Sequence, residues 1–119
     1  MPMIEGRYHT ELLSRREARL VFGKLESALR EAIRQVRPEK TEYGITVEGD
    51  PYVIAFNEPE LRIYVFYHQE WNFTPEELKI LASAMLAGVM KILDANNIKD
   101  QQVQVRFYER AGHAGAKNR

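Results

Sequence analysis

Two long segments of the chain have hydrophobic residues at helical spacing. In residues 14–36 the apolar positions recur every three or four residues, which predicts a helix with one buried face. Ser14 and Glu17 form a capping-box pattern at its start, and Pro38 ends the helix near Val36. The apolar positions of this segment are Ala18, Val21, Phe22, Leu25, Leu29, Ala32, Ile33 and Val36.

The second helical segment covers residues 74–97. Thr74 is the predicted N-cap, Pro75 occupies the first helical position, and Glu77 completes a second capping box. Apolar residues lie on almost every side of this segment, so we expect the helix to be buried nearly all round. Asn96 and Asn97 suit the left-handed conformation that closes a helix.

Alternating apolar and polar residues predict strands in the rest of the chain. A first strand runs from Met3 to Tyr8. The stretches "YGITV", "YVIAF" and "LRIYVFYH" follow the first helix, with "GDP" and "NEPE" as turns between them. The last of the three, residues 61–68, is apolar on both faces, which is typical of a central strand. "QVQVRFY", residues 102–108, is the final strand.

This order of elements predicts an α+β fold. Two β-α-β halves would form a duplicated, mixed four- to five-stranded sheet with two helices on one face. Residues 1–110 are expected to be a single domain, and residues 111–119 a flexible C-terminal tail. The other face of the sheet would then need a ligand or another subunit to cover it.

Composition narrows the possible functions. The chain has no cysteine, which excludes thiol catalysis and disulfides. Its 17 basic and 17 acidic residues balance, which argues against nucleic-acid binding. No apolar run is long enough for a membrane span, and we expect a cytoplasmic protein. His9, His68 and His113 lack metal-ligand spacing, and no nucleotide-binding motif occurs, so neither a metal nor another cofactor is expected.

Several stretches together resemble the tautomerase superfamily, including its macrophage migration inhibitory factor-like members. They are "MP" at the start, "RPEKTEYGITVEGDP", "IAFNEPE", "LRIYVFYH" and "QVQVRFYER", and the likeness extends over residues 2–110. The resemblance implies that Pro2 becomes the amino terminus when Met1 is removed. Its secondary amine would then act as the base that moves a proton between carbons next to a carbonyl. It also implies a homotrimer whose sheets form a central barrel.

The same resemblance implies a set of substrate-binding residues. Arg37 is similar in position to a family lysine that contacts substrate, while Gln104 and Arg106 share the face of the last strand where the family has asparagine and tyrosine. Arg7 on the first strand adds a further cation. Two arginines favour a small anionic substrate, because a guanidinium pairs with a carboxylate in two places.

Structural interpretations of these residues remain open. One interpretation is that Pro2 occupies the second position by chance. Another is that the "IEGR" string, residues 4–7, derives from a cloning vector. Arg37 would cap helix carbonyls, and Arg106 would pair with a glutamate on a neighbouring strand. The resemblance is compatible with a tautomerase-like enzyme or a pseudoenzyme of that fold, and a structural subunit of a larger assembly is a third possibility.

A second class of function is a non-catalytic protein-interaction module. The order of helices and strands also resembles a secretion-chaperone-type dimer, which uses the uncovered sheet face to hold a partner segment. In that case the residues before the first helix would be disordered. Tyr64, Phe66 and Trp71 would contribute to the binding surface.

Overall fold

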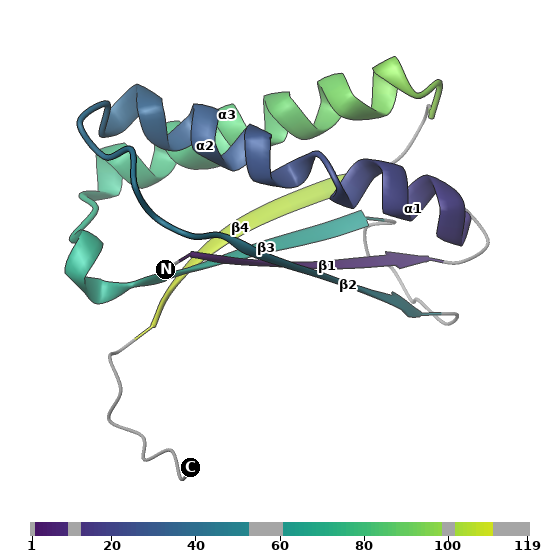
Figure 1. Cartoon of the computed structure of the whole chain (residues 1–119), viewed down its shortest axis with the longest axis horizontal. Helices are drawn as coiled ribbons and strands as arrows, with labels where there is room; N and C mark the ends of the chain where they lie inside the picture. Colours follow the sequence, from purple (N-terminus) through teal and green to yellow (C-terminus); the bar gives the residue numbers. More distant parts are fainter. Residues whose placement is uncertain (1, 10–12, 53–60, 99–101, 111–119) are drawn as a thin grey trace, which may run out of the picture.

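The computed structural model describes residues 2–9, 13–52, 61–98 and 102–110, which form a sheet with its helices on one face (Figure 1). This arrangement confirms the predicted α+β fold. In chain order the elements are β1 (Met3–His9), α1 (Arg15–Phe22), α2 (Leu25–Val36), β2 (Thr46–Tyr52), β3 (Leu61–His68), the 3-10 helix η1 (Gln69–Trp71), α3 (Pro75–Ala95) and β4 (Val103–Arg110).

The sheet is built from two β-α-β units. The four described strands lie in the order β2-β1-β3-β4. β1 pairs with β2 in parallel, and β3 pairs with β4 in parallel, whereas the central pair β1 and β3 is antiparallel. Each helical connection therefore joins two adjacent parallel strands, as the predicted duplication requires.

The strand register assigns residues to the two faces of the sheet. In β3, Leu61, Ile63, Val65 and Tyr67 are buried beneath the helices, and the residues between them are half-buried on the other face. β3 is thus the central two-sided strand that its sequence predicts. Within the described chain no helix covers the second face (Figure 1), and we call it the open face. Its residues include Met3, Glu5, Arg7, Arg62, Tyr64, Phe66, His68, Gln104, Arg106, Tyr108 and Arg110.

Both predicted capping boxes are present. The Ser14 amide donates to the Glu17 carboxylate at 2.9 Å, and the Glu17 amide donates to the Ser14 hydroxyl at 3.1 Å. Thr74 and Glu77 exchange the equivalent bonds at 2.9 and 3.1 Å before α3. These bonds satisfy amides that have no partner within the helix, so they fix where each helix begins.

The first predicted helix is interrupted at Gly23 and Lys24. The Gly23 amide bonds to the Arg19 carbonyl, the Lys24 amide bonds to the Val21 carbonyl, and α2 begins at Leu25. The single helix predicted over residues 14–36 was therefore wrong in this detail. Glycine is a weak helix former, and the break reorients the chain between the two helices.

Phe22, the last residue of α1, packs against two glycines of the sheet. Gly6 and Gly49 are register partners in β1 and β2. A Cβ atom added at Gly6 would lie 2.7 Å from two Phe22 ring carbons, and one at Gly49 would lie 2.2 Å from two others. These distances are far below ordinary carbon contacts, so the ring needs both glycines.

This packing also identifies the "IEGR" string, residues 4–7, as part of the sheet. Ile4 is fully buried and Gly6 lies under the Phe22 ring. The predicted turn at "GDP", residues 49–51, was wrong because the backbone of β2 continues through these residues in parallel register with β1. Pro51 is compatible with a strand here because β2 is at the edge of the described sheet.

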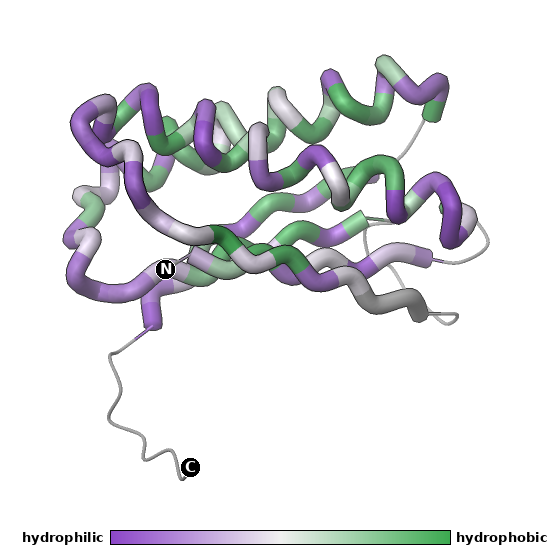
Figure 2. Tube along the Cα trace, viewed as in Figure 1, coloured by the Kyte–Doolittle hydropathy of each residue, from purple (hydrophilic) through white to green (hydrophobic). Residues whose placement is uncertain are grey.

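α3 is less buried than its sequence predicts. Leu81, Met85, Val89 and Leu93 face the core, but Ile80, Leu86 and Met90 are 45, 38 and 40% exposed. Figure 2 shows that α3 is rich in hydrophobic residues, whereas α1 and α2 carry more hydrophilic ones. Among the helices of the described residues, none combines the length and apolar character that crossing a bilayer requires.

Two expectations lie outside the described residues. The predicted strand "YVIAF" falls mostly in residues 53–60, together with the "NEPE" turn, and the predicted tail is residues 111–119. The single-domain assignment over residues 1–110 therefore stays a prediction.

Candidate functional site

Pro2 is buried and is held at the start of β1. Its carbonyl accepts a hydrogen bond of 3.2 Å from the Thr46 amide, so the parallel pairing with β2 extends to it. Strand alternation places Pro2 on the same face as the buried Ile4, beneath the helices. The chain's second residue is therefore an ordered part of the sheet.

The register identifies the neighbours of Pro2. Met3 pairs with Phe66 across the antiparallel ladder and with Thr46 across the parallel one. One position further, Pro2 comes opposite Tyr67 on β3 and beside Ile45. Figure 1 shows that the start of β1, the end of β3, η1, the end of α2 and the start of α3 lie at the same end of the molecule.

Aromatic rings gather at this end. Tyr67 packs edge-to-face on Phe73 with ring centroids 5.1 Å apart, and Phe73 stacks on Trp71 at 5.3 Å. Trp71 in turn meets Tyr43 edge-to-face at 5.3 Å. The rings make an apolar wall on the helix side of the sheet near Pro2, which lowers the local dielectric constant.

Arg37 lies at the same end and donates four hydrogen bonds to protein groups. Its Nε and Nη2 donate to the two carboxylate oxygens of Glu77 at 2.9 Å each. Nη1 donates to the Trp71 carbonyl at 2.8 Å and Nη2 to the Asn72 carbonyl at 3.1 Å, and the guanidinium stacks over Phe73. Arg37 therefore ties the end of α2 to η1 and the start of α3.

The Arg37–Glu77 pair is also electrostatically coupled. The Arg37 guanidinium, followed by the Thr74 amide, lowers the pKa of Glu77 to about 2, and the Glu77 carboxylate raises the pKa of Arg37. The two side chains are 20 and 21% exposed, so water partly screens the pair. Its geometry is that of a structural clamp, but its partners are the Trp71 and Asn72 carbonyls and the Glu77 carboxylate rather than the helix carbonyls that the capping interpretation expected.

Arg7, Gln104 and Arg106 lie on the open face. Arg7 pairs with Arg62 on β3, which pairs with Gln104 on β4, so these three occupy one row across the sheet. With the Gln104 amide oxygen turned toward Arg106, it accepts from the Arg106 guanidinium at 3.1 and 3.2 Å. Gln104 and Arg106 are therefore in contact, and Arg7 lies two strands away on the same face.

Pro2 lies on the opposite face of the sheet from Arg7, Gln104 and Arg106. Arg106 pairs with Tyr64, which pairs with Glu5, three residues along β1 from Pro2. Side chains on opposite faces of a strand cannot contact the same small molecule. The sequence-predicted residues therefore form two groups in one chain, with Pro2 and Arg37 at one end beneath the helices and the others on the open face.

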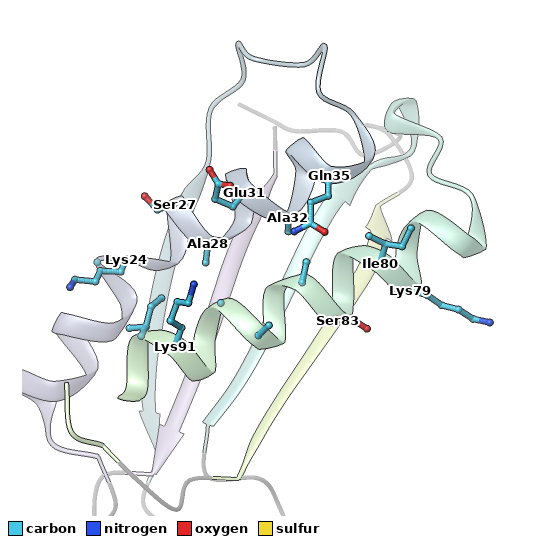
Figure 3. A pocket seen from close by; sticks show the side chains of 15 residues that line it. Lys24, Ser27, Ala28, Glu31, Ala32, Gln35, Lys79, Ile80, Ser83 and Lys91 are labelled. Carbon is cyan, nitrogen blue, oxygen red and sulfur yellow. The ribbon is translucent and has the colours of Figure 1, made fainter. Parts of the chain in front are cut away.

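A groove lies elsewhere, between α2 and α3 on the outer side of the helix layer (Figure 3). It has a volume of about 1060 Å³, and its floor is made of small residues such as Ala28 and Gly88. Figure 3 shows Lys79 extending away from it. The lining includes lysines and Glu31, whose carboxylate pairs with Arg34.

Tyr67 is a candidate residue that the sequence did not single out. Its position opposite Pro2 depends on how β1 and β3 are aligned, and alternation within one strand gives no information about that alignment. In the described part of the chain, no group of three or more His, Cys, Asp or Glu side chains is arranged to hold a metal ion.

Comparisons with known proteins agree with the fold. No family model matches the sequence, and no curated protein matches it. Solved structures do match. MIF2 of Leishmania major is 17% identical with a TM-score of 0.63, covering 98% of this chain and 93% of its own.

Two more structures are similar over nearly the whole chain. N1, a member of the cis-3-chloroacrylic acid dehalogenase family, has a TM-score of 0.65 at 14% identity and covers 97% of this chain and 79% of its own. Pt0534, solved after inactivation by 2-oxo-3-pentynoate, has a TM-score of 0.59 at 19% identity, covering 96 and 91%. These identities establish architecture rather than chemistry, and the chain accordingly has the fold of the tautomerase superfamily, which its sequence resembles.

Proposed function

We propose that this protein is a tautomerase-like enzyme in which the amine of Pro2 acts as a base on a small carboxylated keto or enol compound. The observation that supports this most directly is the position of Pro2. It is buried, hydrogen-bonded into the sheet through its carbonyl, and next to an apolar aromatic wall.

The physical basis is desolvation of a secondary amine. Removing Met1 leaves the Pro2 nitrogen as the chain terminus, and a buried amine is easier to deprotonate because burial disfavours its charged form. A neutral amine at physiological pH can take a proton from a carbon next to a carbonyl. The electron pair of that C–H bond moves toward the carbonyl oxygen, and Pro2 returns the proton to the enolate, either at its oxygen or at its carbon.

The open face supports an oligomer as part of the same proposal. It presents Tyr108, whose ring packs on both Tyr64 and Phe66, with Arg110 stacked over Phe66. A cluster of aromatic rings and arginine is typical of protein interfaces. We favour a homotrimer in which these faces meet.

Oligomerisation would also decide how the cations take part. Since Arg7, Gln104 and Arg106 face away from Pro2 within one chain, a substrate held at Pro2 can contact such residues only from another copy, one whose sheet edge reaches the Pro2 end of this chain. In this proposal the Arg106 fork binds the substrate carboxylate. Arg37, four of whose five N–H donors bond protein groups, would act by holding η1 and α3 in place.

The non-catalytic interaction module is the second candidate, because the same aromatic open face could hold a partner segment as a dimer. Two observations weigh against it. Residues Met3–His9 pair with strands on both sides, and Trp71 packs with Tyr43 and Phe73 beneath the helices, apart from Tyr64 and Phe66. For the tautomerase-like enzyme we also propose a cytoplasmic location.

The test uses intact mass and a reactive probe. Wild-type protein should lack Met1, and 2-oxo-3-pentynoate, which inactivates Pt0534, should add once and at Pro2. The conjugated alkyne accepts the prolyl nitrogen, forming a C–N bond as one alkyne π bond is lost and a proton is gained.

The second experiment compares wild type with Pro2→Ala, which has a primary amine in place of the secondary amine of proline. Wild type should catalyse exchange of the C3 protons of 2-oxobutanoate in D₂O, and Pro2→Ala should not. Retention of Met1, or equal exchange by Pro2→Ala, would refute the proposal.

A further inference from the structure

The sheet register aligns three chemically active residues in one row. One position beyond the Met3–Phe66 pair, Pro2 comes opposite Tyr67, and Tyr67 is the direct partner of Glu109 on β4. All three belong to the face beneath the helices, by alternation from Ile4, Val65 and Phe107. Neighbouring residues in such a row have Cβ atoms about 5 Å apart. Pro2 and Tyr67 are therefore neighbours in this row, with Glu109 beyond them.

The environment of Tyr67 is unusual for a residue of the core. The side chain is 5% exposed, yet it is separate from the main hydrophobic cluster and packs on Phe73 at the end of the sheet. Within the described residues, no protein group hydrogen-bonds its hydroxyl. Tyr67 Oη is not among the buried polar atoms that lack a partner, so this hydroxyl reaches the protein surface, where it can donate to a ligand.

The protonation state of Tyr67 suits that use. Burial raises the pKa of the phenol, and the Glu109 carboxylate raises it further. The hydroxyl therefore stays protonated at neutral pH, where it can donate a hydrogen bond. A phenol beside a developing negative charge is a common source of electrostatic stabilisation.

We propose that the Tyr67 hydroxyl is a catalytic group that donates a hydrogen bond to the carbonyl oxygen of the substrate held at Pro2. This inference rests on the proposed function. When the Pro2 nitrogen removes the proton from carbon, the C–H electron pair forms a carbon–carbon double bond and the carbonyl electrons move onto oxygen. Tyr67 stabilises that oxygen in place and needs no net proton transfer. When the proton returns to carbon, the charge on oxygen is lost again.

The same row points to the class of substrate. The reacting part has to fit between an amine and a phenol against the rings of Phe73 and Trp71, so it is a flat, conjugated enol or keto group. A 2-oxo acid meets this description, since its ketone can face Tyr67 while its carboxylate extends beyond the row.

The test compares Tyr67→Phe with a matched control, Tyr8→Phe. Tyr8 is the other buried tyrosine of this face, lies at the opposite end of β1, and packs edge-to-face on Phe22 at 5.6 Å. Both variants remove one hydroxyl and keep the ring. Tyr67→Phe should lower kcat for C3 exchange of 2-oxobutanoate by about 100-fold, the typical loss for one oxyanion donor, with KM nearly unchanged. Tyr8→Phe should match wild type.

Labelling by 2-oxo-3-pentynoate separates this inference from the function on which it rests. Charge also builds on the ketone oxygen during the addition, so Tyr67→Phe should label at Pro2 but at least about tenfold more slowly. If wild type and Tyr67→Phe label Pro2 at the same saturating rate, the role of Tyr67 is refuted while Pro2 keeps its own. If wild type does not react at Pro2, the proposed function fails, and the role of Tyr67 fails with it.

Discussion

Replacing Gly6 by alanine tests how β1 is fixed beneath the helices. The added methyl would lie 2.7 Å from the Cε1 and Cζ atoms of Phe22. Carbon atoms prefer separations of about 3.5–4.0 Å, so the ring has to move by roughly 1 Å. Phe22 also packs edge-to-face on Tyr8 at 5.6 Å, which limits its movement. Overpacking of this kind costs about 1–3 kcal/mol, and we expect the free energy of unfolding to fall by about 2 kcal/mol.

A double-mutant cycle with Phe22→Ala measures the contact itself. Removing the ring leaves room for the methyl, so Gly6→Ala should cost almost nothing in the Phe22→Ala background, and the coupling should be about 2 kcal/mol. Urea unfolding can be followed by the fluorescence of Trp71, the chain's single tryptophan, at one fixed protein concentration. As a control, Glu5→Ala on the open face of the same strand should shift stability by less than about 0.5 kcal/mol. Additive costs in the cycle would show that the ring does not rest on Gly6.

Two further predictions concern the clamp and the open face. Because the pKa of Glu77 is lowered to about 2 by Arg37, the pair stabilises the fold fully above the ordinary carboxyl pKa of 4.5 and loses this contribution as pH falls toward 2. Urea titrations from pH 6 to pH 3 should therefore give a shallower loss of stability for Glu77→Gln than for wild type, and parallel curves would contradict the assignment. Phe66→Glu, which places a charge against Tyr108 on the open face, should shift the mass measured by light scattering from trimer to monomer, whereas Leu20→Glu on α1 should not. A wild-type monomer would exclude the oligomer.

Local features were predictable from the sequence because they depend on residues close in the chain. The capping boxes at Ser14 and Thr74 need partners three residues away, and both formed. The break at Gly23 and the straight course of β2 through residues 49–51 depend instead on where Phe22 meets the sheet and on pairing with β1. A glycine that accepts a ring from another element looks the same in sequence as one that makes a turn.

Only the part of the candidate site that depends on residues close in the chain could be predicted from the sequence. The first strand places Pro2 at its start, and that position required no knowledge of other strands. The separation of Pro2 from Arg106, and the closeness of Pro2 to Tyr67, follow from the alignment of three strands. Arg37 was expected near the site from its place after the first helix, but its bonds to Glu77 and to two carbonyls come from segments about 35 and 40 residues away.

The most direct test of the account is the titration of the Pro2 nitrogen. After mass spectrometry has confirmed that Met1 is absent, protein with ¹⁵N-labelled proline can be titrated by NMR and compared with a peptide of the same opening sequence. If Pro2 is a buried base, its amine in the folded protein will titrate clearly below the peptide value, because burial disfavours the charged form. A folded-state value equal to that of the peptide would contradict the proposal that Pro2 acts as the base.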